Sequence, residues 1–216
     1  MISRLLFVFL SVLLPSMNAL ADDVVKLPPD ILVKQMVDDV LSALKQHSEI
    51  THDLTKMDDL VDARVLSHFD FTRLTQLTVG NKYWAGTTSQ ERQQLTAEFH
   101  TFLEHVFSDV IAQYTDQTIL FIPSQMQPDA GNITIKTVIM DPRDESTQLD
   151  FRMEKTDSGW LIYDVDIDNL SLIRIYHSNF SNELLHGGVP GLVGVLHMKN
   201  QKAAADRNKK NLTINN

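Results

Sequence analysis

The spacing of apolar residues changes twice along this chain. From residue 29 to residue 114 apolar positions recur at helical intervals, as in Val33, Val37, Val40 and Leu44. From residue 118 to residue 168 short apolar runs alternate with polar positions, and after Ser171 the helical spacing returns. We therefore predict an α+β fold in which helices cover one face of a curved antiparallel four-stranded sheet.

Local signals place the ends of the predicted helices. Pro28-Pro29-Asp30 opens the first helix, and a short second helix is expected over residues 58–67. Asp70 can cap a third helix that ends at Gly80, and Thr88 with Glu91 forms a capping box that opens the longest one. A further helix is expected from Ser171 to Gly187-Gly188, and a last one from Pro190.

The longest predicted helix carries a broad apolar face. At about 100° per residue, its large apolar residues cover an arc of roughly 180°, whereas one-sided packing needs about 100°. These residues are Leu95, Phe99, Phe102, Leu103, Val106, Phe107, Val110, Ile111 and Tyr114. The surplus surface must be covered by a second protein layer or by an apolar ligand, and the wheel alone favours neither.

Four strand-like runs follow, at residues 118–124, 132–141, 147–156 and 160–168, with Asp157-Ser158-Gly159 as a hairpin turn. In the last run Leu161, Tyr163, Val165 and Ile167 alternate with Ile162, Asp164, Asp166 and Asp168. This alternation predicts a half-buried strand with the first set inward. We interpret the three aspartates as a solvated face rather than a metal or catalytic site.

The first residues have the three parts of a secretory signal. A single Arg4 precedes the apolar run of residues 5–14, and Ala19-Leu20-Ala21 forms a cleavage site. That run is shorter than the roughly 20 residues that span a bilayer, although an uncleaved anchor is the alternative. We expect a signal peptide over residues 1–21, export to the periplasm after cleavage behind Ala21, and one domain over residues 22–200. The polar residues 201–216 are expected to be a disordered tail.

Composition excludes several kinds of protein. The formal charge is −9, which disfavours binding to nucleic acid or to anionic membrane surfaces. The chain has no cysteine, so disulfides, thiol nucleophiles and cysteine metal sites are excluded. His100 and His105 lie about 140° apart on the helical wheel, and we expect them to be solvent-exposed. Phosphate-loop, dinucleotide-binding and serine-hydrolase motifs are missing, so nothing in the sequence argues for an enzyme or a cofactor.

A series of short motifs resembles the Ttg2/MlaC family. In chain order they are VG-x-x-x-W (Val79, Gly80, Trp84), a helix start with Thr87, Glu91 and Arg92, F-R-M (Phe151 to Met153), GW-x-x-YDV (Gly159, Trp160, Tyr163 to Val165), SL-x-x-x-Y-x-x-x-F (Ser171, Leu172, Tyr176, Phe180) and G-x-x-G-L (Gly188, Gly191, Leu192). The resemblance runs from about Leu32 to Asn200. One departure is His177, where the family often has arginine.

The resemblance implies a periplasmic phospholipid-binding protein of the Mla lipid-transport and toluene-tolerance system. Such a protein would be a monomer that carries phospholipid as cargo between an outer-membrane lipoprotein complex and an inner-membrane ABC transporter with an MCE-domain subunit. This transport would maintain outer-membrane lipid asymmetry. The implied fold is similar to nuclear transport factor two and cystatin, with acyl chains between sheet and helices.

For that cargo we predict a lining from both layers. The long helix would supply Phe99, Phe102, Val106, Val110 and Tyr114; the sheet would supply Phe121, Ile135, Ile139, Phe151, Met153, Val165 and Ile167; and Leu172, Tyr176 and Leu192 would close one end. Arg73, Arg152 and His177 are the candidates for the mouth. Two alternatives are a structural adaptor that binds no lipid and an enzyme on the same cone-shaped scaffold.

Overall fold

A computed structural model describes residues 27–114, 116–123 and 131–214. The predicted signal peptide lies outside these residues. In chain order the elements are α1 (Pro29–Gln46), η1 (Ser48–His52), α2 (Leu54–Arg64), η2 (Leu66–His68), α3 (Phe71–Val79), α4 (Asn81–Trp84), α5 (Ser89–Ile111), β1 (Thr118–Ile122), β2 (Asn132–Met140), β3 (Thr147–Thr156), β4 (Gly159–Ile167), β5 (Leu170–Ser171) and α6 (Leu172–Ile214). The predicted α+β class and the order of helices, strands and helices are confirmed.

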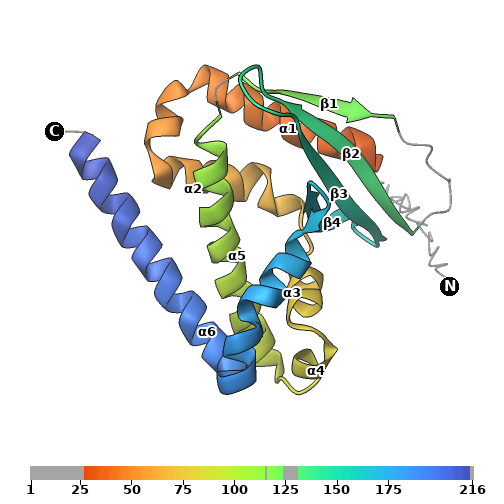
Figure 1. The fold of residues 1–216 in the computed structure, drawn as a ribbon, viewed down its shortest axis with the longest axis vertical. Coiled ribbons are helices and arrows are strands. Elements are labelled where there is room, and N and C mark those ends of the chain that lie inside the picture. Colours follow the sequence, from red (N-terminus) through yellow and green to blue (C-terminus); the bar gives the residue numbers. More distant parts are fainter. Residues whose placement is uncertain (1–26, 115, 124–130, 215–216) are drawn as a thin grey trace, which may run out of the picture.

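The strands form one antiparallel sheet in the order β1-β2-β3-β4-β5. The sheet has five strands rather than the predicted four, because Leu170–Ser171 pair briefly with the end of β4 before α6 begins. Figure 1 shows the sheet on one side of the molecule and the helices on the other. The helical layer meets the sheet mainly at its two sides, with α1 along β2 and with α3 and α6 at β4.

Side-chain caps explain where the helices begin. The Thr88 hydroxyl accepts from the Glu91 N–H, and the Glu91 carboxylate accepts from the Thr88 N–H, so the predicted capping box opens α5. Asp70 caps α3 as predicted, through the Arg73 N–H. The second helix starts earlier than predicted, at Leu54, because the Asp53 carboxylate accepts from the N–H groups of Thr55 and Lys56.

Helix α6 is kinked at Gly188 (φ 60°, ψ −160°), followed by Pro190, where we predicted a break between two helices. It then continues to Ile214, so the prediction of a disordered tail from residue 201 is wrong for residues 201–214. Polar anchors hold this half of the helix: Asn200 donates to the backbone and carboxylate of Glu98, and Asn211 donates to Asp53. Composition alone could not show these contacts, because their partners lie about 100 residues or more earlier in the chain.

A β-bulge changes the predicted faces of β4. The register passes from Arg152 opposite Asp164 to Met153 opposite Ile162, so Tyr163 has no direct partner on β3. Ile162 therefore joins the inward face and is fully buried, whereas Leu161 and Tyr163 are half-buried. The prediction of a simple alternation across this strand is wrong before Asp164 and correct for Val165.

The prediction that the β4 aspartates form a solvated face is also wrong for two of them. Asp164 is 1% exposed and Asp166 is 8% exposed. Asp164 accepts from the Ser171 hydroxyl at 2.7 Å and from the Ile173 N–H at 3.1 Å, while Arg152 lies beside both carboxylates. Asp164 thus anchors the start of α6 to the sheet.

A buried ionic cluster joins α2, α5 and the C-terminal half of α6. Arg207 Nε lies 2.8 Å from Asp58 Oδ2, and its Nη2 reaches the Asp109 carboxylate and the His105 carbonyl. His105 Nδ1 lies 3.3 Å from the same Asp58 oxygen, with 12% of its side chain exposed. The expectation that His105 is solvent-exposed is therefore wrong, whereas His100 is partly exposed beside Asp62.

Glu104 on α5 yields a prediction about stability. Partial burial, together with the neighbouring carboxylates of α2 (Asp58 foremost), raises the pKa of Glu104 to about 7. The folded state then holds this proton more tightly than the unfolded chain, so stability falls as pH rises from 4.5 to 7. The shift corresponds to about 3 kcal/mol, which solvent screening of this partly exposed side chain reduces to about 1 kcal/mol.

We therefore expect Glu104→Gln to stabilise the protein by about 1 kcal/mol at pH 8 and by nothing at pH 4. Urea denaturation at both values measures the difference. An equal effect at the two values would contradict the assignment.

Candidate functional site in the layer between sheet and helices

The strand register defines the face of the sheet that meets the helices. Ile119 pairs with Ile139, Phe121 with Thr137, and Thr137 with Leu149. Further along, Ile135 pairs with Phe151, and Phe151 pairs with Val165. Directly paired residues of antiparallel strands point to the same side, so this face is apolar apart from Thr137 and from Thr147, the partner of Ile139. The Thr137 hydroxyl is satisfied by the Leu149 carbonyl.

About half of the predicted lining lies in the closed core. These residues have 9% or less of their surface exposed: Phe99, Ile135, Phe151, Met153, Val165, Leu172, Tyr176 and Leu192. Phe99 and Phe102 of α5 belong to an aromatic cluster with Tyr176 and Phe180 of α6, with ring centroids 5.4–6.5 Å apart. The apolar arc of α5 is thus partly covered by α6, which is the second protein layer that the wheel left open.

The remaining half-buried apolar surface lies towards the end of α5 and on the inward face of the first three strands. Only three residues separate Tyr114 from Thr118, and Figure 1 shows the C-terminal end of α5 approaching this end of the sheet. Large apolar side chains from both layers are half-buried: Val106, Phe107 and Ile111 of α5 and Tyr114 just after it, with Ile119, Phe121, Ile139 and Leu149 of β1, β2 and β3. We call these eight residues the interlayer seam.

The seam contains Val106, Tyr114, Phe121 and Ile139 from the predicted lining. Two other predicted residues lie further out, since Val110 is 63% exposed and Ile167 is 38% exposed. Sequence reasoning did not assign Phe107, Ile111, Ile119 or Leu149 to the site, although the wheel of α5 and the alternation of the strands carried the signal. It also missed Lys34 of α1, whose ammonium lies 5.8 Å from the Phe121 ring centroid and places a cation beside the seam.

The three mouth candidates lie elsewhere. Arg73 pairs with Glu154 at 2.9 Å and lies over the Tyr163 ring. Arg152 points to the opposite face of the sheet, because its neighbours Phe151 and Met153 point inward. His177 Nδ1 lies 2.8 Å from the Thr78 carbonyl at the end of α3. The structure therefore does not bring these residues to the interlayer seam.

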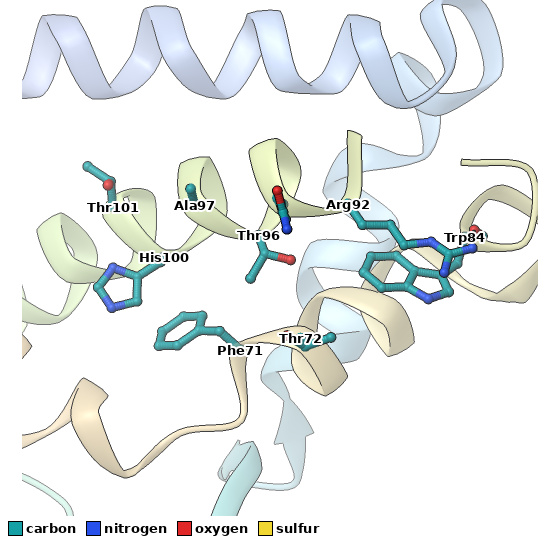
Figure 2. Close-up of a pocket in the computed structure, with 9 residues that line it drawn as sticks. Phe71, Thr72, Trp84, Arg92, Thr96, Ala97, His100 and Thr101 are labelled. Carbon is teal, nitrogen blue, oxygen red and sulfur yellow. Dashed lines mark hydrogen bonds between the residues drawn. The ribbon is translucent and has the colours of Figure 1, made fainter. Parts of the chain in front are cut away.

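Two surface hollows lie among the described residues, and none of the predicted acyl-chain lining residues contributes to either. A groove of about 590 Å³ between α3, α4 and α5 has Trp84 under Arg92 at one end and Phe71 against His100 at the other (Figure 2). A second hollow of about 410 Å³ lies beside Arg152, Tyr163 and Arg174. Threonine, glutamine and arginine side chains interrupt the apolar surface of the groove.

Two features are missing from the residues that the structure describes. Among them, no cluster of three or more histidine, aspartate or glutamate side chains could hold a metal ion. No described helix combines the length and hydropathy that a membrane span requires.

Comparison with known proteins identifies the family of this chain. The family model described as MlaC protein matches residues 34–198. No curated protein matches the chain. Among solved structures, the chain is similar to the phospholipid-binding protein from Ralstonia solanacearum in complex with a phospholipid. The two are 30% identical, and the match covers 81% of this chain and 98% of that chain with a TM-score of 0.74. The chain therefore belongs to the MlaC family.

Proposed function

We propose that this protein is a periplasmic phospholipid carrier that holds acyl chains between its sheet and its helices. The observation that carries the proposal is the similarity, over nearly the whole of that chain, to a protein solved with a phospholipid. The interlayer seam supports it, since eight large apolar side chains of α5, of the segment after it and of the inward face of the sheet remain half-buried. Acyl chains could complete the burial of these side chains.

The chemistry of the cargo explains this arrangement. Each methylene group exposed to water costs about 0.8 kcal/mol, so a carrier must enclose the chains in a dry space. It must also release them, and an empty apolar cavity would lose packing contacts. A closed core with a half-buried edge allows both enclosure and release of the acyl chains. Side chains along the seam can separate when acyl chains enter. The proposal further places the carrier between an outer-membrane lipoprotein complex and an inner-membrane ABC transporter with an MCE-domain subunit, where it maintains lipid asymmetry.

Paired variants on the same two strands test the seam. Ile119→Thr with Ile139→Thr changes the inward face, whereas Leu120→Thr with Met140→Thr changes the adjacent residues on the outer face. Loss of about 1 kcal/mol of apolar contact per side chain predicts phospholipid binding at least tenfold weaker for the inward pair. The measurement is binding of a fluorescent phospholipid to each purified protein.

The outer pair is the matched control, because Leu120 and Met140 are 50% and 43% exposed. It should bind lipid like the unchanged protein. Equal lipid binding by the two paired variants would contradict the proposed site.

A further inference from the structure

The C-terminal half of α6 presents two unlike sides. Leu196, Asn200 and Arg207 are buried against the rest of the molecule and define its inward side. At about 100° per residue, the opposite side carries Met198, Lys202, Ala205, Lys209 and Leu212. All five of these side chains are exposed. In Figure 1 this half of α6 runs along the outside of the helical layer, away from the sheet.

The charge of this outward side differs from that of the whole protein. Lys199 and Lys210 lie on one flank of the helix, about 100–120° from the middle of the stripe, and Asp206 lies between them and the stripe. Together with Lys202 and Lys209, the exposed surface of this half of α6 carries four lysines and one aspartate. The whole chain has a formal charge of −9. Charges separated by more than about 8–10 Å are largely screened at physiological ionic strength, so the local positive charge decides what binds here.

Apolar side chains accompany the lysines. Met198 is 63% exposed and Leu212 is 68% exposed, and with Ala205 they recur every seven residues along the same side. Lysines attract anionic lipid headgroups, and exposed apolar side chains beside them can enter the headgroup region. Lysine is depleted at protein–protein interfaces, which favours a lipid surface over an acidic protein as the partner.

We infer that the outward side of α6 from Met198 to Leu212 docks on an anionic phospholipid surface. The lysines would lie at the phosphate groups, and Met198 and Leu212 would enter the headgroup region. This surface lies on a different part of the molecule from the interlayer seam. The inference rests on the proposed carrier function only for the biological purpose of docking. That purpose is to hold the protein at a membrane during lipid exchange.

Vesicle co-sedimentation tests the inference with protein that begins at Asp22, so that residues 5–14 cannot bind the vesicles themselves. Vesicles contain phosphatidylcholine alone or with one-third phosphatidylglycerol. We expect binding to the anionic vesicles that weakens with added salt, and little binding to the neutral ones. Replacing Lys199, Lys202, Lys209 and Lys210 by glutamine should weaken anionic-vesicle binding by about tenfold or more.

The matched control replaces Lys45, Lys56, Lys82 and Lys136 by glutamine, which removes the same charge from other exposed positions. This variant should bind anionic vesicles as tightly as the unchanged protein. Equal weakening in the two variants, or absence of binding by the unchanged protein, would overturn the inference. Mass spectrometry of the same samples separates the two proposals: protein without bound phospholipid that still docks would overturn the carrier function alone.

Discussion

Arg207→Met is expected to lower the free energy of unfolding by about 3–5 kcal/mol. Methionine keeps most of the aliphatic volume but leaves the carboxylate of Asp58 buried without its cation. The side chains of Arg207 and Asp58 are 7% and 10% exposed. Burial alone would raise the pKa of Asp58, but hydrogen bonds from His105 and Ser108, with the charge of Arg207, hold it below its ordinary value.

The lowered pKa gives the sign of the pH dependence. The ion pair stabilises the fold above pH 3.8 and loses its effect as pH falls and Asp58 becomes protonated. The destabilisation by Arg207→Met, measured by urea denaturation, should therefore be largest near neutral pH. The double variant Asp58→Asn with Arg207→Met should recover much of the loss, because both charges are then gone. A double variant no more stable than Arg207→Met would show that the buried charge is not the cause.

Asp164→Ala is expected to destabilise the protein by about 3 kcal/mol. The substitution leaves the Ser171 hydroxyl and the Ile173 N–H without their acceptor at the start of α6. It also removes a carboxylate beside Arg152. Thermal unfolding followed by circular dichroism measures the loss.

Asp168→Ala, in the turn directly after β4, is the control, because Asp168 is exposed although it accepts from the Gln148 N–H. We expect it to lose about 1 kcal/mol. If the two variants unfold at the same temperature, Asp164 does not anchor α6.

Asp58 and Asp164 show how far the structure could be predicted from the sequence. Signals that act within a few residues were sufficient for helix starts at Asp70 and Thr88, and for the ranges of the four long strands. Burial of a polar residue depends on partners far along the chain, such as Arg207 for Asp58. The sequence pattern therefore predicted exposed positions for His105 and Asp164, and a disordered tail where α6 continues.

The candidate site was likewise predictable only where local sequence signals define it. The wheel of α5 predicted more apolar surface than one-sided packing needs, and the aromatic cluster and the interlayer seam account for it. Which residues belong to each could not be predicted, because the position of α6 decides that Phe99 is covered while Phe107 remains half-buried. The mouth candidates were chosen by charge, but Arg152 is paired with aspartates on the outer face of the sheet.

Native mass spectrometry of the protein purified from a periplasmic extract tests the carrier function most directly, when it is combined with lipid extraction of the same sample. The account predicts a bound mass equal to that of a phospholipid, which the extract then identifies. It also predicts that protein stripped of lipid takes up phospholipid from vesicles. A bare polypeptide mass, with no phospholipid extracted and none taken up, would contradict the account and favour an adaptor without cargo.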